Sequence, residues 1–351
     1  MLSGSMTDPA SRFRILQFAE PLRARGHEVA VRASVPSRQW KSALPDGVFR
    51  RMHSGLGAAG RLINAVWRIR DLEKFDVVMM NRDLVPEVKV RFLEPWMYSR
   101  KAKIVFDFDD AIHLGPRREK IEGILKLSQG AAAGNDTLAA FARAFQPRRC
   151  AVIPTVADTL RWVPQKERRA GPFRAGWSGS VGSFSLAAPL LKKISECLTE
   201  VDQEAEFVLV LEKDPRVNWG GRRVIYRRWT ERSEVELIQD FDVGLMPLED
   251  SPFERGKCGL KAVQYMACGI PALVSPVGVN REIVNHDKTG FHCSTFDQWR
   301  ASLTWAVQNR DKLAQMGRAG RERAVKFYSV DAVLAALEDL LKTASEGGAN
   351  V

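Results

Sequence analysis

The chain has 351 residues, more than the roughly 100–200 residues of a typical domain, so two domains of moderate size are expected. Apolar residues make up 45% of the chain and charged residues 27%, a balance that excludes a wholly disordered protein. The formal net charge of +11 favours an anionic partner. Composition alone leaves open whether that partner is a nucleotide, a nucleic acid or an anionic membrane surface.

The sequence shows no membrane-spanning or disulfide pattern. It has no run of about 18 apolar residues, so no transmembrane helix is predicted. Its start lacks the basic and then apolar pattern of a secretory signal. The five cysteines form no CxxC pair, and an odd count fits reduced thiols better than disulfides or a zinc site. We therefore expect a cytoplasmic protein, with peripheral contact at the inner membrane face as an open alternative.

The first half of the chain alternates short apolar runs with longer helical patterns, which is typical of βαβ units around a parallel sheet. Residues 76–80 and 103–106 are predicted to be buried strands, and residues 131–135 the end of another. Residues 62–72 and 87–99 can form helices between them. The polar, proline-bearing stretch that follows this half predicts an exposed linker.

The second half repeats the pattern. A helix is predicted at 184–198 and a strand at 207–211, and the sequence ends in an amphipathic helix at 330–343. Three further strands are predicted in the same sheet, at 224–226, 243–246 and 272–274. Ligands of such sheets bind beyond the carboxyl ends of the strands, so functional residues are expected in the loops between strand and helix.

The most informative segment is 241–271, which predicts a strand, a loop, a helix and a stop at Gly269. Lys257, Lys261 and Gln264 have the spacing of one helical face. The amides and dipole of the helix N-terminus would add to the lysine charge and hold a diphosphate, with Gln264 meeting ribose hydroxyls. The spacing fits equally well with two solvated lysines on an exposed helix.

Extended to residue 284, this segment resembles the donor-binding signature of retaining glycosyltransferases with the GT-B fold, family 4 (glycosyltransferase group 1). Four other segments are similar to further parts of that family. They are the start of the first helix, an acceptor-domain aspartate segment, the interdomain crossing, and the first strand and glycine loop of the donor domain, at 11–14, 106–113, 153–158 and 176–180.

The resemblance implies two Rossmann-like α/β domains facing a central cleft, with the C-terminal helix returning to the first domain. The expected parts are an acceptor-side domain (1–153), a linker (154–172), a nucleotide-sugar-binding domain (173–328), and a helix and tail (329–351). Only ten residues precede the first-helix segment, too few for a full strand and glycine-rich loop. Either the start of the chain is misassigned, or the acceptor-side domain is shortened and its first strand is missing.

The implied activity is transfer of a sugar from a nucleoside-diphosphate sugar to a hydroxyl acceptor, with retention of anomeric configuration. The acceptor class stays open among a glycan, a lipid-linked acceptor and a small molecule, in polysaccharide or cell-envelope synthesis. No cofactor and no metal are expected, because lysines would neutralise the departing diphosphate.

The resemblance also implies donor-binding residues: Gly179, Ser180, Glu254, Gly256, Lys257, Lys261 and Gln264. Many members of the family carry a Glu-x7-Glu pair on the donor helix, where this chain has Gly256 and Gln264. Gln264 can still exchange hydrogen bonds with ribose but offers no carboxylate. Glu254 and Asp250 are the candidates to replace the missing first glutamate.

On the acceptor side, Asp107, Asp109 and Asp110 follow a buried strand and are expected at its carboxyl end. Asp109, Asp110 and His113, together with Lys261, are the predicted catalytic residues. The aspartates could instead bind Mg²⁺ or Mn²⁺, or cap loops and helices, and a lone histidine is more often structural. The remaining acceptor-side candidates are Arg12, Arg14 and Asn135.

Other functions compatible with the sequence are a sugar-nucleotide epimerase of the same fold and a non-catalytic sugar-nucleotide-binding protein. The arginine pairs along the chain are dispersed and lack interleaved aromatic residues, so nucleic-acid binding is not expected. They are interpreted as a solvated surface, with attraction to an anionic membrane as the alternative. Trp67, Trp96, Trp162 and Trp177 are predicted to be core residues rather than sugar platforms.

Overall fold

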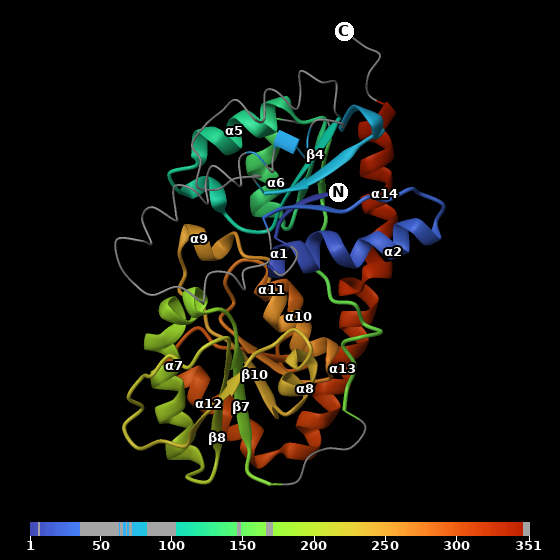
Figure 1. The fold of residues 1–351 in the computed structure, drawn as a ribbon. Helices are drawn as coiled ribbons and strands as arrows, with labels where there is room; N and C mark the ends of the chain where they lie inside the picture. Colours follow the sequence, from blue (N-terminus) through green and yellow to red (C-terminus); the bar gives the residue numbers. More distant parts are fainter. Residues whose placement is uncertain are drawn as a thin grey trace. The chain divides into compact units, whose positions relative to one another are not determined.

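The computed structural model describes residues 1–5, 8–35, 63, 66–67, 69, 72–82, 103–145, 149–165 and 171–346. It divides into two compact units, which we call unit 1 (Met1–Thr155 with Val333–Val351) and unit 2 (Val156–Ala332). Each unit is a six-stranded parallel sheet with helices against it (Figure 1), which confirms the prediction of an α/β protein with two Rossmann-like domains. The predicted helix at 87–99, and most of that at 62–72, lie outside the described residues.

The sheet of unit 1 has the strand order β2-β1-β3-β4-β5-β6. Its strands are β1 (Leu2–Ser5), β2 (Arg32–Val35), β3 (Val78–Asn81), β4 (Ile104–Phe108), β5 (Gly130–Ala133) and β6 (Cys150–Val152). The expectation that the first strand is missing is wrong, because β1 pairs with both β2 and β3. Four residues are enough for this strand, so the short stretch before the first helix does accommodate it.

The helical elements of unit 1 begin with α1 (Pro9–Ser11), the π-helical turn η1 (Arg12–Leu16) and α2 (Gln17–Ala24). They continue with η3 (Leu72–Lys74), η4 (Ile112–Leu114), α5 (Arg118–Leu127) and α6 (Asp136–Arg143). The last helix, α14 (Val330–Glu346), starts in unit 2 and belongs to unit 1 from Val333 onward. The predicted return of the C-terminal helix to the first domain is therefore confirmed.

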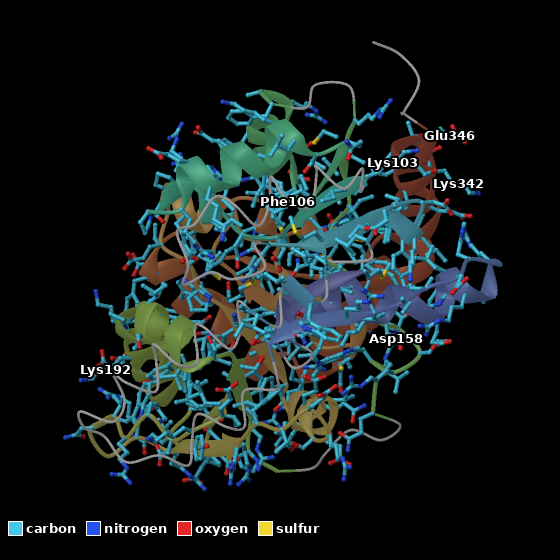
Figure 2. All side chains as sticks on the ribbon, turned by 45° about the horizontal axis from the view of Figure 1, so that its top comes forward. Lys103, Phe106, Asp158, Lys192, Lys342 and Glu346 are labelled. Carbon is cyan, nitrogen blue, oxygen red and sulfur yellow. The ribbon has the colours of Figure 1, made fainter. Side chains whose placement is uncertain are left out.

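Charged groups fix α14 against unit 1. The Glu338 carboxylate accepts hydrogen bonds from Arg25 at 2.7 Å and His27 at 2.9 Å, and Lys342 lies 2.8 Å from it. Near the end of the helix, the Lys103 ammonium donates to the carbonyl of Ser345. Figure 2 shows Lys103 close to Lys342 and Glu346 at this end of the helix. The attachment thus involves polar groups along about two helical turns, from Glu338 to Ser345.

The sheet of unit 2 has the strand order β12-β11-β10-β7-β8-β9. The strands are β7 (Arg174–Ser178), β8 (Glu206–Leu211), β9 (Val224–Arg228), β10 (Val243–Met246), β11 (Ala272–Val274) and β12 (Gly290–His292). The strands predicted in this half are all confirmed. β7, β8, β10 and β11 are buried along their whole length. This explains why β10, β11 and, after Glu206, β8 are apolar without alternation.

Helices cover both faces of this sheet (Figure 1): α7 (Val181–Val201) and α12 (Phe296–Gln308) lie on one side. On the other side lie α8 (Glu234–Gln239), α10 (Leu260–Ala267) and α13 (Arg310–Tyr328), while α9 (Pro252–Arg255) and α11 (Asn280–Ile283) are short helices at strand ends. Gly269 follows α10 with φ +71°, the left-handed helix ending that the sequence predicts. Within the described residues, no helix is both long and apolar enough to cross a membrane.

The tryptophan predictions have different outcomes. Trp162 and Trp177 are buried, with 1% and 2% of their surface exposed, and this confirms them as core residues. Trp67 is 60% exposed, so its assignment to the core is wrong. Trp96 lies outside the described residues.

Candidate active site

In unit 2, the carboxyl ends of β7, β10 and β11 lie side by side, because these strands are parallel neighbours. In open α/β sheets this edge is where ligands bind. The loops at the edge are tied to one another through Ser275, which follows β11. Its hydroxyl accepts a hydrogen bond from the amide of Leu248 at 3.0 Å, and its carbonyl accepts one from the Asn280 side chain at 3.1 Å. These two hydrogen bonds connect the loop after β10 and the start of α11 to the end of β11.

Helix α10 starts at Leu260, immediately after Gly259, which has φ +67°. A Cβ atom at Gly259 would lie 2.1 Å from Cδ1 of Ile283, so only glycine fits both the backbone and the space. In the described part of the chain no side chain caps this helix. The first amides of an uncapped helix are suited to bind an anion.

This start corrects the prediction that Lys257, Lys261 and Gln264 share one helical face. Lys261 and Gln264 are on α10, whereas Lys257 lies in the loop before it. Gln264 is buried, with 7% of its surface exposed, one turn after Lys261. The spacing of four residues between Lys257 and Lys261 misleads because Gly259, in a left-handed conformation, lies between them and precedes the helix.

The side chain of Lys261 crosses from α10 to the loop after β7. Its ammonium lies 5.4 Å from the centroid of the Trp177 ring, on β7. A Cβ atom at Gly179 would lie 2.6 Å from the Trp177 ring and 3.1 Å from Cε of Lys261. Gly179 therefore gives space to these two side chains. Its amide donates to the carbonyl of Val210 at 3.1 Å, which ties the loop after β7 to β8.

Ser180 and Tyr265 hold this edge in place. The Ser180 hydroxyl caps α7 by accepting from the amide of Ser183 at 3.2 Å. Tyr265 is fully buried, and its hydroxyl accepts from the amide of Ser178 at 3.2 Å and donates to the carbonyl of Leu245 at 3.3 Å. Burial raises the pKa of Tyr265 to about 12, so its hydroxyl stays protonated. Tyr265 thus links β7, β10 and α10.

Of the two carboxylates considered as replacements for the missing glutamate, Glu254 is buried and Asp250 is exposed. The Glu254 carboxylate lies 2.8 Å from the Lys257 ammonium, and Gly256 follows it as the C-cap of α9. Asp250 accepts hydrogen bonds from Arg255 at 2.6 and 3.0 Å, and these bonds lower the pKa of Asp250. The buried pair of Glu254 and Lys257 is therefore the acidic and basic pair closest in sequence to the start of α10.

In unit 1, Asp107 lies within β4 and is fully buried, so the expectation that it opens at the carboxyl end is wrong. Its carboxylate accepts from the Arg14 guanidinium at 2.5–3.2 Å and from the Asn81 amide at 2.7 Å. Burial raises the pKa of Asp107, and Arg14 opposes that rise. Arg14 also donates to the carbonyl of Ile153 and is itself fully buried. Arg14 therefore supports the frame of unit 1 and is not on its surface.

Asp109 and Asp110 share one cation, Arg82, at the end of β3. The Arg82 guanidinium donates twice to one oxygen of Asp109, at 2.7 and 3.0 Å, and once to Asp110 at 2.6 Å. Burial works to lower the pKa of Arg82, but Asp109 and Asp110 raise it overall. The side chains of Asp109 and Asp110 are 14% and 31% exposed, so solvent reaches both. Sequence analysis missed Arg82, although the parallel pairing of β3 and β4 places it beside the aspartates.

The remaining acceptor-side candidates are held within unit 1. The His113 ring stacks on Phe141 with centroids 3.8 Å apart, and its Nδ1 is buried with no hydrogen-bond partner among the described residues. Burial lowers the pKa of His113, which favours the neutral ring. Asn135 caps α6 by accepting from the amide of Leu138 at 2.9 Å. Arg12 is buried, with its guanidinium over the Phe13 ring at 5.2 Å.

Solved structures share this two-unit fold. Sucrose-phosphate synthase from Thermosynechococcus elongatus superposes with a TM-score of 0.70 at 15% identity, covering 97% of each chain. HepE from Anabaena in complex with UDP and glucose gives 0.70 at 14% identity, covering 97% of this chain and 99% of that one. A glycosyltransferase from Rickettsia africae gives 0.69 at 12% identity, covering 99% of each. The fold is therefore GT-B, as the sequence predicted.

Residues 226–323, all in unit 2, match the family described as Glycosyl transferases group 1. The D-inositol 3-phosphate glycosyltransferase of Gordonia bronchialis is 34% identical over 88 residues, which are 24% of this chain and 19% of that protein. The match thus spans about a fifth of the length of that relative. This chain accordingly has the GT-B fold, and a region of its unit 2 is similar to the Glycosyl transferases group 1 family.

Proposed function

We propose that this protein is a glycosyltransferase that moves a sugar from a nucleoside-diphosphate sugar to a hydroxyl acceptor. The observation that carries the proposal is the start of α10, where Lys261 lies on the first turn of a helix without a side-chain cap. Lysine charge and helix amides together are suited to a diphosphate. The structures of Anabaena HepE with UDP and with UDP-glucose support the same class of donor here.

In this proposal Lys261 and the α10 amides neutralise the negative charge that develops on the departing diphosphate. Such charge stabilisation by fixed groups is a large contribution in group-transfer enzymes. Lys257, beside Glu254, supplies the second amine before the helix. These groups replace a metal ion, and we propose that the enzyme needs none. Gln264 is assigned to the ribose hydroxyls, and the resemblance to retaining enzymes supports transfer with retention.

Asp109, Asp110 and His113 of unit 1 are proposed as the acceptor side. The two carboxylates are solvent-accessible and held by Arg82, so they can accept hydrogen bonds from a hydroxyl group. The neutral His113 ring can exchange a proton with such a hydroxyl. Acceptor class, a role in polysaccharide or cell-envelope synthesis, and cytoplasmic location with contact at the inner membrane face stay predictions.

The test compares donor binding in Lys261→Ala with a matched control, Lys192→Ala. Lys192 is an exposed lysine of α7 in the same unit, and Figure 2 shows it projecting away from the ribbon. Nucleoside-diphosphate sugars with different bases and sugars are screened by thermal stabilisation and then titrated by calorimetry. We expect Lys261→Ala to weaken the best donor about 10- to 100-fold, the loss of a hydrogen bond to a charged group. Lys192→Ala should bind as the wild type does.

Equal donor affinity in the two variants contradicts the proposed site. Product analysis with the donor alone distinguishes the other functions: a changed sugar on the intact nucleotide indicates an epimerase. Binding without transfer or hydrolysis indicates a non-catalytic protein.

A further inference from the structure

Trp177 occupies a fixed position at the end of β7, next to the proposed donor site. Only 2% of its surface is exposed, so its ring is not available as a sugar platform. The ring packs edge-on against Phe184 of α7, with centroids 5.8 Å apart and an interplanar angle of 65°. This packing fixes the position of the indole ring against α7, and Lys261 contacts the same ring from α10.

Lys261 meets the indole at a distance typical of a cation–π contact. Its ammonium lies 5.4 Å from the ring centroid, within the roughly 6 Å over which the ring quadrupole attracts a cation. Trp177 and Lys261 come from different elements, β7 and α10, so the contact depends on the pairing of β7 with β10. Tryptophan provides the strongest such attraction among the aromatic side chains.

Gly179 lies against both the same lysine and the indole ring. The position of a Cβ at Gly179 lies 3.1 Å from Cε of Lys261 and 2.6 Å from the Trp177 ring. The end of the lysine stem therefore lies close to both the indole ring and Gly179. A lysine side chain has four rotatable bonds and loses much freedom when its ammonium is held in one place. The contacts with Trp177 and Gly179 reduce the conformational freedom of Lys261 that a bound anion would otherwise have to restrict.

We propose that Trp177 is a positioning residue of the donor site, which holds the Lys261 ammonium in place for a diphosphate. The inference rests on the proposed function, because it assigns Lys261 to that ligand. Trp177 itself contacts no ligand. It acts through Lys261, so its effect on diphosphate binding exists only while that amine is present.

The test is a double-mutant cycle on UDP affinity, measured by calorimetry with UDP as the probe. Trp177→Leu should weaken UDP binding about 3- to 30-fold in the wild-type background, the range of a desolvated cation–π contact. Trp177→Phe should lose less, because phenylalanine retains a weaker ring quadrupole. In the Lys261→Met background, Trp177→Leu should change UDP affinity by less than about twofold, the usual error of additivity.

The matched control is Trp299→Leu. Trp299 lies on α12 of the same unit and is also 2% exposed, so its substitution removes comparable packing away from Lys261. Thermal melts of all variants establish that they are folded, and Trp299→Leu should bind UDP as the wild type does. A merely structural role of Trp177 would weaken UDP binding equally with and without Lys261, and this result would overturn the inference while leaving the donor site intact. Unchanged UDP affinity in Lys261→Met would overturn both.

Discussion

Substitution of Gly259 by alanine tests whether the start of α10 depends on one close contact. Gly259 has φ +67°, a left-handed conformation that costs a residue with a side chain about 1–2 kcal/mol. The new Cβ would also lie 2.1 Å from Cδ1 of Ile283, far inside the ordinary separation of about 3.5–4 Å. Overpacking of this kind costs about 1–3 kcal/mol. We expect Gly259→Ala to lower the free energy of unfolding by about 2–5 kcal/mol.

Two further variants separate the free-energy cost of the left-handed backbone from the cost of the steric clash with Ile283. Gly221 in the same unit has φ +77° and nothing within 4 Å of its Cβ position, so Gly221→Ala should lose only about 1–2 kcal/mol. Ile283→Val removes the offending Cδ1 atom and should alone cost about 0.5–1.5 kcal/mol. With that atom gone, the nearest neighbours of the new Cβ are the Asn280 side-chain oxygen at 3.2 Å and Ile283 Cγ1 at 3.6 Å.

The double variant Gly259→Ala with Ile283→Val should therefore be more stable than the sum of its parts by about 1–3 kcal/mol. Urea denaturation measures the free energies, with hydrogen exchange used to assign the transition of unit 2. The reasoning is refuted if the two substitutions are additive, or if Gly259→Ala is no more damaging than Gly221→Ala.

Two other predictions concern unit 1. Arg82→Lys keeps the charge but loses the double hydrogen bond to Asp109, so acceptor-dependent turnover should fall about 10- to 100-fold while UDP affinity stays unchanged. The exposed Arg143→Lys is the control, and equal turnover in the two variants would contradict the role of Arg82. Hydrogen bonds from Lys342, His27 and Arg25 lower the pKa of Glu338 from 4.5 to about 2. Its contribution to stability is thus complete above pH 4.5 and is lost as the pH falls toward 2. Thermal melts should show a flatter pH dependence for Glu338→Gln in this range, and parallel curves would argue against this role.

Apolar periodicity predicted the fold because both sheets are parallel and covered by helices. Strands such as β8 and β10 are buried on both faces, so they appear in the sequence as short continuous apolar runs. β1 did not follow from this pattern: its four residues include two serines and a glycine. It is a strand because β2 and β3 lie on either side of it, and such pairing is not visible in a local segment.

The candidate site was predictable in part. Lys261 and Gln264 were found from helical spacing, but the true start of α10 depends on the left-handed conformation of Gly259. Asp107 is fully buried and Asp109 is reached by solvent because β4 ends between them: Asp107 is within the strand and Asp109 follows it. Boundaries of elements are the least certain feature of any sequence pattern, so all three aspartates were expected at the carboxyl end of the strand.

Contacts between segments that are distant in the sequence could not be predicted from local sequence patterns. The contact of Trp177 with Lys261 joins two elements that lie far apart in the sequence. Trp177 was correctly predicted as a core residue, but burial alone does not show which charged group lies over its ring. The same holds for Tyr265, whose hydroxyl bonds to Ser178 and Leu245 become visible only once β7, β10 and α10 are assembled.

The two candidate centres differ in charge, and this difference fits the two substrates of the proposed reaction. In unit 2, Lys257, Lys261 and the α10 amides provide positive potential for a diphosphate. In unit 1, the carboxylates of Asp109 and Asp110 are solvent-accessible and lie beside the Arg82 guanidinium. An accessible carboxylate suits a hydroxyl group, which donates a hydrogen bond and becomes more nucleophilic as its proton is drawn away. In the proposed function, the positive net charge of the whole chain fits the donor, and the acidic pair Asp109 and Asp110 is assigned to the acceptor.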